Sequence, residues 1–568
     1  MRASSPERER AAPHPWLAHY PKDIDWHAAL PEAPLHAVLD EAAARYRKRP
    51  FLDFLGRKCT YGEAGAIVEK LAGAFQEMGV GRGVKVGLLL PNCPQFVFCF
   101  FAVLKAGGTA VLYNPLRAEK EIAQQIEDSE TDVMVTVDIR RIHSKIAHVL
   151  PGSRLKRIVV CRFGRSLPWS KRILFSLTKG RERIAIPRDG IHVPFERLLR
   201  HSHKVDPPKI DPRRDIAALI YTGGTTGTPK GVCLSHANLY ANLRQTALGL
   251  PSAVPGKERV LAVIPFFHAF GMTAVLNAGI ALGAEILVLP RFDLWEVLRT
   301  VRQRRPTILP AVPTVFAAVA SQPNGDRPDL SSLRLCTCGG DTLPSDIRQS
   351  FRRLAGCDLF QGYGLSECSP VVTGCAPSGL DKPGSIGVPV PGTEVEIVSL
   401  EDSRTPLAPG EKGEICVRGP QVMMGYWKRP DATAQVLREG WLHTGDIGFM
   451  DEDGYFYVVD RLKDLVITGG YNVYPSVVEA AIQEHPAVRE VAVVGLPDPH
   501  WGQQVTAFVV PAADRAPSQD ELLDFLKDKL SSYEMPKSVR FLKELPKSMI
   551  GKVLKAQFRQ TYRVARHD

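Results

Sequence analysis

Short runs of apolar residues alternate with longer apolar or amphipathic segments through most of the chain. In one stretch an apolar run at 84–91 is followed by a longer segment at 94–107, which ends in lysine and glycine, and by a short run at 109–115. Two short buried strands joined by a helix form a βαβ unit in a parallel sheet covered on both faces. Similar runs at 132–138 and 284–290 predict further strands. The pattern predicts an α/β fold.

The pattern changes after Asp460. Short β-rich runs at 490–498 and 504–512 alternate with charged helical segments at 475–486 and 518–532. This alternation over about a hundred residues is typical of a small α+β domain.

The chain of 568 residues is longer than a single hydrophobic core usually supports. We therefore expect a large N-terminal α/β domain at 1–460, with parallel or mixed sheets flanked by helices. A small, mobile α+β domain at 461–568 would follow. The segment between Asp460 and Lys463 leaves no room for a long linker and is predicted to act as a hinge.

An uncharged apolar stretch at 260–284 is long enough to span a bilayer. The stretch is interrupted by Pro265, His268, Gly271 and Gly279, and no polybasic flank fixes an orientation. A buried strand, a turn and a buried helix explain the stretch, so we expect no membrane span there.

The segment 161–184 differs from its surroundings. It carries seven basic residues and one acid, with apolar residues such as Trp169, Leu174 and Leu177 between them. Basic and apolar residues together favour reversible binding to an anionic membrane surface. The alternative is a basic surface loop whose apolar residues pack onto the large domain.

The overall charge and the cysteines bear on the possible ligands of the protein and on its cellular compartment. A formal net charge of +11 permits attraction to nucleotides, coenzyme A or anionic lipid, and is also compatible with a solvated basic surface. The first residues lack the apolar core of a secretory signal, and the eleven cysteines have no zinc or disulfide spacing. We expect a cytoplasmic protein, with peripheral attachment to the inner face of a membrane left open.

The strongest local motif is YTGGTTGTPKGV at 221–232, which begins where an apolar run ends. Glycines let backbone amides approach an anion, hydroxyls add donors and a lysine adds a cation, so the loop suits a triphosphate. Gly231 follows Lys230, so the loop is not a Walker A motif. A flexible polar hairpin is the alternative. The candidate ATP-binding residues here are Thr222, Gly223, Gly224, Thr225, Thr226, Gly227, Thr228 and Lys230.

This loop resembles the phosphate-binding signature of the adenylate-forming superfamily, which comprises acyl-CoA synthetases, firefly luciferases and peptide-synthetase adenylation domains. Further segments resemble that superfamily in the same order along the chain. They are YGEAGAIVEKLAGAF near Tyr61, PFFHAFGM (265–272), CGGDTLP (338–344), QGYGLSE (361–367), GWLHTGDIG (440–448), DRLKDLVITGGYNVYP (460–475) and PKSMIGKVLK (546–555). The resemblance therefore covers nearly the whole chain.

The resemblance implies roles for residues of the large domain. Glu367 would bind magnesium between the ATP phosphates, as a hard carboxylate oxygen can. Asp446 would accept hydrogen bonds from the ribose hydroxyls with Arg461 beside it, although such a pair could equally be structural. The remaining candidates would border adenine or the phosphates; they are Gly340, Asp341, Tyr363, Gly364 and Ser366.

The resemblance also implies residues that act on the acyl group. His268 would orient the reacting carboxylate near the α-phosphate, whereas a lone histidine in an apolar stretch is usually a core residue. Lys552 would bridge the carboxylate and phosphate oxygens as the adenylate forms. Lys463 occupies the hinge position, and Gly469 and Gly470 would border the coenzyme A pantetheine, although paired glycines are also common in turns.

The implied activity is that of an acyl-CoA synthetase of the long-chain fatty acid type. It would use ATP, Mg²⁺ and coenzyme A on a fatty acid, with no nucleic acid partner. Three alternatives stay open: loading of a carrier protein, activation of a non-fatty acid, and light-emitting oxygenation, for which no distinct residue speaks. A membrane or interaction protein without catalysis is a fourth, but Lys230, Glu367, Asp446 and Lys552 are all present.

Overall fold

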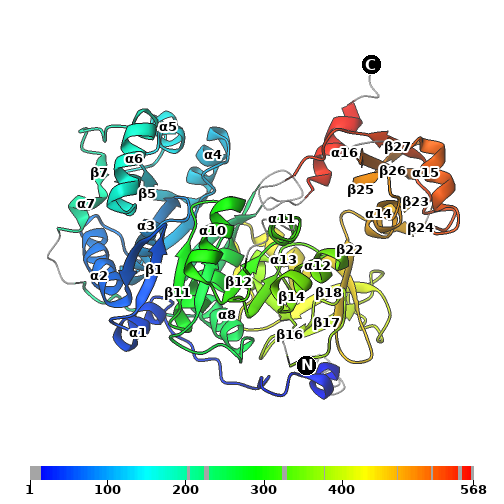
Figure 1. Cartoon of the computed structure of the whole chain (residues 1–568), viewed down its shortest axis with the longest axis horizontal. Coiled ribbons are helices and arrows are strands. Elements are labelled where there is room, and N and C mark those ends of the chain that lie inside the picture. Colours follow the sequence, from blue (N-terminus) through cyan, green and yellow to red (C-terminus); the bar gives the residue numbers. More distant parts are fainter. Residues whose placement is uncertain are drawn as a thin grey trace, which may run out of the picture. The chain divides into compact units, whose positions relative to one another are not determined.

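The computed structural model describes residues 14–200, 205–222, 229–322, 329–375, 378–469, 471–512, 516–547 and 553–564. The chain divides into two compact units. Figure 1 shows their helices and strands coloured along the sequence. The larger unit comprises His19–Glu394 and Val417–Leu442, and the smaller comprises Met1–Ala18, Val395–Cys416 and His443–Asp568. The expected boundary between residues 460 and 461 stays a prediction, because compactness alone does not locate a hinge.

The larger unit contains an eight-stranded sheet. Neighbouring strands from β8 to β7 run parallel, whereas β9 runs antiparallel to both β8 and β19. In order across the sheet the strands are β19 (Gly425–Tyr426), β9 (Lys230–Ser235), β8 (Ile216–Thr222), β4 (Thr109–Leu112), β3 (Lys85–Leu89), β5 (Thr131–Val137), β6 (Arg157–Cys161) and β7 (His192–Pro194). The predicted βαβ unit is confirmed, with β3 and β4 parallel and α3 (Pro94–Lys105) between them in the chain.

A nine-stranded sheet completes the larger unit. Its neighbouring strands from β14 to β1 are parallel, and antiparallel strands close both ends. Across the sheet they are β16 (Val388–Pro389), β15 (Val371–Gly374), β14 (Leu359–Gly364), β13 (Leu335–Cys338), β12 (Ile308–Ala311), β10 (Arg259–Ala262), β11 (Glu285–Val288), β1 (Pro50–Phe54) and β2 (Arg57–Thr60). The strand predicted at 284–290 is β11.

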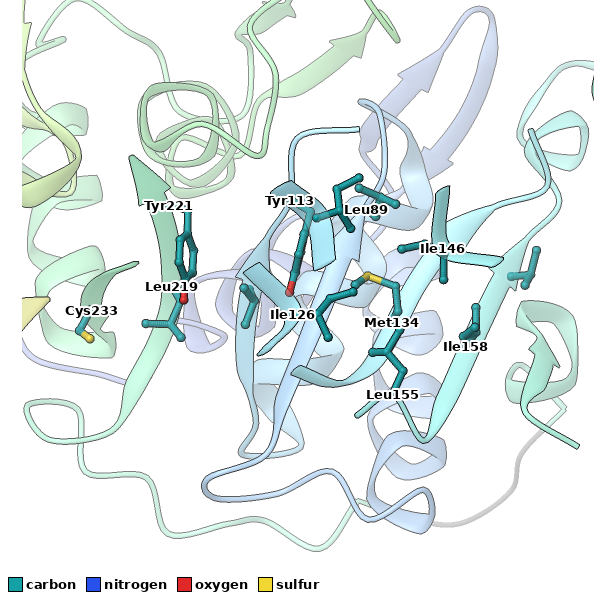
Figure 2. Close-up of a cluster of buried hydrophobic side chains, with 13 residues drawn as sticks. Leu89, Tyr113, Ile126, Met134, Ile146, Leu155, Ile158, Leu219, Tyr221 and Cys233 are labelled. Carbon is teal, nitrogen blue, oxygen red and sulfur yellow. The ribbon is translucent and has the colours of Figure 1, made fainter. Parts of the chain in front are cut away.

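Helices flank these sheets and fill the spaces between them. Ten consecutive residues of α3, Gln95–Leu104, are buried, as its unbroken apolar sequence requires. The other helices of this unit are α1 (Ala37–Arg45), α2 (Tyr61–Glu77), α4 (Glu119–Ser129), α5 (Arg140–Val149), α6 (Trp169–Lys179), α7 (Phe195–Leu198), α8 (His236–Leu248), α9 (Ala278–Ala281), α10 (Leu294–Arg304), α11 (Pro313–Ala320), α12 (Ser345–Ala355) and α13 (Pro430–Val436). Ile126 of α4 and Ile146 of α5 belong to a buried cluster with Met134, Leu219 and Tyr221 of the sheet (Figure 2).

The apolar stretch 260–284 forms the strand, turn and helix that its sequence predicts. It contains most of β10, a π-helical segment at Gly271–Asn277 and the short α9. Within the described residues, no helix is both long enough and apolar enough to cross a bilayer.

The smaller unit contains two sheets. One is formed by β17 (Glu394–Val398), β18 (Gly413–Arg418), β21 (Trp441–Met450) and β22 (Phe456–Arg461), while the short strand β20 (Leu437–Arg438) falls in the larger unit. The other contains β24 (Tyr471–Val473), β23 (Val466–Thr468), β26 (Gly502–Pro511), β25 (Val488–Asp498) and β27 (Ser538–Phe541), with helices α14 (Pro475–Gln483), α15 (Gln519–Leu526) and α16 (Lys555–Val564). The strands and helices predicted at 475–486, 490–498, 504–512 and 518–532 are present and pack around two buried clusters.

Candidate functional site

The two ends of the predicted phosphate loop are joined in a strand pair. Thr222, the last residue of β8, lies opposite Lys230, the first residue of β9. The loop residues between them, 223–228, lie outside the described residues, so the roles expected for three glycines and three threonines there stay predictions. Thr222 and Lys230 thus lie at the carboxyl end of β8, the edge where α/β sheets bind ligands.

Glu367 and Lys230 meet around a tyrosine that the sequence analysis did not single out. Tyr426 of β19 donates a 2.8 Å hydrogen bond from its hydroxyl to Glu367 Oε1. Lys230 Nζ lies 5.1 Å from the centre of the Tyr426 ring. Burial, followed by the nearby charge of Glu367, raises the pKa of Tyr426 well above its ordinary value. Tyr426 therefore stays a hydrogen-bond donor that orients the carboxylate of Glu367, and the three side chains form one cluster.

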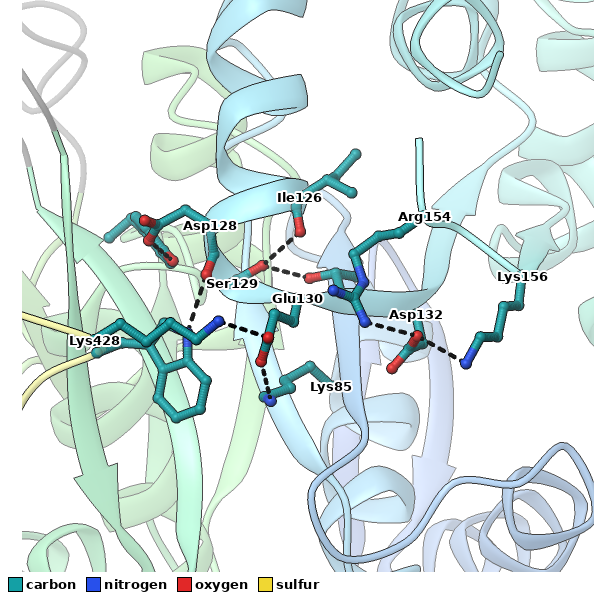
Figure 3. A network of polar contacts seen from close by, with 12 residues as sticks. Lys85, Ile126, Asp128, Ser129, Glu130, Asp132, Arg154, Lys156 and Lys428 are labelled. Carbon is teal, nitrogen blue, oxygen red and sulfur yellow. Dashed lines mark hydrogen bonds and ion pairs between the residues drawn. The ribbon is translucent and has the colours of Figure 1, made fainter. Parts of the chain in front are cut away.

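An ion-pair network anchors the segment that carries Tyr426 (Figure 3). Glu130, at the end of α4, accepts a 2.6 Å contact from Lys428 and a 3.0 Å contact from Lys85. The Trp427 indole donates to the carbonyl of Asp128 at 3.0 Å. Because Lys428 and Trp427 follow Tyr426 directly, this network fixes the position of the tyrosine.

We expect Glu130→Gln to weaken the larger unit near neutral pH. Lys428 first, and then Lys85, lower the pKa of Glu130 to about 2. A carboxyl group with a lowered pKa stabilises the fold above its unfolded pKa of about 4.3, and this contribution is lost as the pH falls toward 2. The substitution should lower the unfolding free energy by about 1 kcal/mol at pH 7, since the pair is partly exposed.

Urea unfolding of the wild type and the variant between pH 7 and pH 3 measures this difference. Glu127→Gln is a matched control, because Glu127 is an exposed acid on the same helix. The difference in unfolding free energy between Glu130→Gln and the wild type should narrow below about pH 4.3. A difference that stays constant with pH would show that the ion pairs of Glu130 do not cause the loss of stability.

The residues expected to border adenine lie at the carboxyl ends of β13 and β14. Gly340 and Asp341 follow β13, Tyr363 and Gly364 end β14, and Ser366 begins the 3₁₀ turn that contains Glu367. A Cβ atom at Gly364 would lie 2.1 Å from the carbonyl oxygen of Pro370, so this position requires glycine. Parallel strands β13 and β14 thus bring the predicted residues to one sheet edge, while their contacts with adenine stay predictions.

His268 lies in the turn between β10 and the π-helical segment. Burial lowers the pKa of its imidazole to about 4, and the positive charge of Arg117 adds to this effect. His268 is therefore neutral at pH 7, and can offer one donor and one acceptor to a reacting group. Its expected role in orienting the carboxylate stays a prediction.

The ribose candidates lie together in the smaller unit. Asp446 of β21 and Arg461 of β22 are paired across two antiparallel strands, with 3.2 Å between Asp446 Oδ1 and Arg461 Nε. Asp446 is buried, and its backbone amide donates to Thr444 Oγ1 at 3.1 Å. The ion pair between Asp446 and Arg461 is therefore present, as their spacing in the sequence permitted. Contact of these two residues with ribose stays a prediction.

Lys463 and Gly469 also belong to the smaller unit. Lys463 lies in the turn after β22, and Gly469 follows β23. Gly469 has a φ of +57°, and a Cβ atom there would lie 2.8 Å from the Trp501 ring, so the backbone itself requires glycine. This explains Gly469 without a ligand, and its coenzyme A role stays a prediction. Gly470 and Lys552 lie outside the described residues.

The chain belongs to the AMP-binding enzyme family. The model of that family matches residues 39–427, and the model of the AMP-binding enzyme C-terminal domain matches residues 477–552. The resemblance inferred from the motifs is thereby confirmed.

Relatives of known name match almost the whole chain. The long-chain-fatty-acid–CoA ligase of Bacillus subtilis (strain 168) is 42% identical over 546 residues, which are 95% of this chain and 97% of that protein. The long-chain-fatty-acid–CoA ligase of Salmonella typhimurium (strain LT2) is 36% identical and matches 96% of this chain and 98% of that protein.

Solved structures agree with the fold. ATP-bound MatB from Rhodopseudomonas palustris superposes with a TM-score of 0.81 at 27% identity, covering 94% of this chain and 99% of that one. The o-succinylbenzoate coenzyme A synthetase of Bacillus subtilis, in complex with ATP and magnesium ion, superposes with a TM-score of 0.76 at 28% identity, covering 93% and 99%. The predicted α/β architecture with a smaller C-terminal sheet domain is confirmed.

Proposed function

We propose that the protein is an AMP-forming ligase that joins a long-chain fatty acid to coenzyme A. The observation that carries the proposal is identity of 42% over almost the full length of a long-chain-fatty-acid–CoA ligase, combined with the cluster of Lys230, Tyr426 and Glu367 at the end of the phosphate loop. The cluster supplies a cation for phosphate oxygens and an oriented carboxylate for a divalent cation.

The reaction has two halves. First, an oxygen of the fatty acid carboxylate attacks the α-phosphorus of ATP, the bond to the bridging oxygen breaks, and pyrophosphate leaves. Then the coenzyme A sulfur attacks the acyl carbonyl, and AMP leaves with the oxygen of the original carboxylate. Carboxylate and triphosphate repel each other, so the first half requires positioned cations, which Lys230 and Lys552 would supply.

Several side chains would hold the reactants in place. Glu367, oriented by Tyr426, would bind Mg²⁺, which neutralises phosphate charge when bound. Neutral His268 would hydrogen-bond the carboxylate, and Asp446 would accept hydrogen bonds from the ribose hydroxyls. Rotation of a small domain at Lys463 would then exchange Lys552 for the side bearing Gly469 and Gly470, a gating step of the kind known in other enzymes.

Release of AMP and pyrophosphate tests the proposal. The purified protein is given ATP, Mg²⁺ and acids from acetate to C18, with and without coenzyme A. Acyl-CoA and AMP should form with long-chain acids and fail to form with acetate. Activity on aromatic acids alone would show that the substrate is a carboxylic acid other than a fatty acid. Turnover only with a carrier protein would favour the carrier-loading alternative.

A second proposal, docking to an anionic membrane through 161–184, is supported by helix α6. None of its residues is buried, and the side chains of Trp169 and Leu177 are 74% and 80% exposed. Beside the helix lies a cavity of about 460 Å³, lined by Ile173, Ser176, Leu177, Gly164 and the four arginines Arg162, Arg165, Arg172 and Arg183. Glu196 pairs with Arg162 and Arg165, and Asp138 pairs with Arg183, so Arg172 supplies the cavity's charge without a carboxylate partner among the described residues. Exposed apolar residues beside such a cation suit a surface of anionic lipids. Phe175 of the helix packs against Phe163 of the same segment.

We expect Trp169→Ser/Leu177→Ser and Lys171→Glu/Arg172→Glu each to reduce co-sedimentation with vesicles rich in phosphatidylglycerol. The first pair removes apolar burial that salt does not screen, and the second removes about 1 kcal/mol of attraction per basic residue. Leu380→Ser, at an exposed leucine outside α6, is the control. Binding that is equal for all variants would show that α6 is not the anchor.

A further inference from the structure

Arg117 is a half-buried cation whose charge has no partner among the described residues. It follows β4, which lies beside and parallel to β8, so it lies at the sheet edge where the phosphate loop begins. Its Nη1 atom is shielded from solvent and has no hydrogen-bond partner in the part of the chain that the structure describes. Its Nη2 atom reaches only the carbonyl oxygen of Tyr221, at 3.4 Å.

The surrounding loop holds Arg117 in place without neutralising it. Lys145 Nζ donates to the carbonyls of Pro115 and Arg117 at 2.9 Å and 2.7 Å, which fixes the backbone and adds a second positive charge nearby. Arg117 forms no ion pair with a described carboxylate, and Glu121 acts on it only from a longer distance. Burial of an unpaired guanidinium destabilises a fold, so packing does not account for this residue.

His268 responds to the charge of Arg117, which adds to the effect of burial in lowering the pKa of the imidazole. Arg117 follows β4 of the eight-stranded sheet, and His268 follows β10 of the nine-stranded sheet. A shielded guanidinium nitrogen that binds none of the described residues is suited to receive an anion.

We propose that Arg117 binds an oxyanion of the reactants, either a phosphate oxygen of ATP or the carboxylate of the acid, and so acts as a further binding residue of the adenylation step. The inference rests on the proposed function, because it assigns the anion to that reaction. The position at the carboxyl end of β4, next to β8 and the start of the phosphate loop, favours phosphate.

The test compares Arg117→Gln and Arg117→Lys with Lys120→Gln, which removes an exposed positive charge from the neighbouring α4. Arg117→Gln should lower kcat/KM for adenylate formation by about 10-fold to 100-fold, as expected for loss of a charge-assisted hydrogen bond. Arg117→Lys should recover part of the rate, and Lys120→Gln should behave like the wild type. Because an unpaired buried charge is removed, the melting temperature of Arg117→Gln should stay the same or rise.

Separate measurements distinguish the two anions. A raised KM for ATP, with weaker calorimetric binding of ATP alone, assigns Arg117 to phosphate, whereas a raised KM for the fatty acid alone assigns it to the carboxylate. A lower melting temperature with unchanged kcat/KM would overturn the inference and make Arg117 structural. If the wild type adenylates no acid, the proposed function fails, and calorimetric binding of ATP and of the fatty acid still decides the role of Arg117: equal affinity of wild type and Arg117→Gln for both ligands overturns the inference.

Discussion

Replacing Lys552 by alanine is expected to lower the rate of adenylate formation by about 10² to 10³, the usual effect of losing one preorganised charged donor. Transfer of the acyl group from presynthesised acyl-AMP to coenzyme A should change little. Lys552 resembles the lysine that reaches the reacting carboxylate and phosphate oxygens only in the first half-reaction. Pyrophosphate exchange and single-turnover thioester formation measure the two halves separately.

Two lysines lie near Lys552 in the sequence, and one of them supplies the control. Lys547 forms a 2.8 Å ion pair with Glu490, and Lys555 forms a 2.7 Å ion pair with Glu479. Both are thus held within the smaller unit, and Lys547→Ala should leave both half-reactions nearly intact. Equal losses in both halves for Lys552→Ala would contradict its assignment to adenylation.

Glu367→Gln should cut ATP-dependent turnover by about 10² and shift the magnesium requirement to higher concentration, because an amide is a weaker ligand for a hard cation than a carboxylate. The change preserves size, and the amide oxygen can still accept the hydrogen bond from Tyr426. A loss of turnover would therefore result from the missing negative charge of Glu367. Turnover as a function of free Mg²⁺ at saturating ATP measures it.

Tyr426→Phe separates the orientation of Glu367 from its proposed binding of magnesium. It removes the 2.8 Å hydrogen bond to Glu367 but keeps the aromatic ring beside Lys230. Its effect on turnover should be smaller than that of Glu367→Gln, with the same direction of change in the magnesium titration. An unchanged magnesium curve for Glu367→Gln would show that this acid is structural.

Local features of the fold could be predicted from the sequence. The βαβ unit at 84–115 was predicted because its strands and helix follow each other directly, and each has a distinct apolar pattern. The same holds for the strands and helices after residue 460. The grouping of 395–416 with the C-terminal part was not predicted, because it depends on strand pairing between distant segments that no local pattern records.

The candidate site was predicted only where its residues belong to motifs. Lys230 and Glu367 lie in recognisable segments, whereas Tyr426 and Arg117 stand alone in the sequence, and their importance depends on what they contact. Tyr426 meets Glu367 through strand β19, a two-residue element too short to give a periodic pattern. Arg117 resembles any surface arginine until burial of its Nη1 atom is known.

The network around Glu130 bears on the synthesis of the protein. Glu130 and Lys428 are 298 residues apart, so at about 5 to 20 residues per second the ribosome needs roughly 15 to 60 s to supply the partner. Until β19 emerges, strand β9 lacks the neighbour that covers it in the folded sheet. An uncovered strand edge invites pairing with other nascent chains. Chains that end before Gly425 should therefore aggregate rather than persist as partly active fragments, and they would lack the tyrosine that orients Glu367.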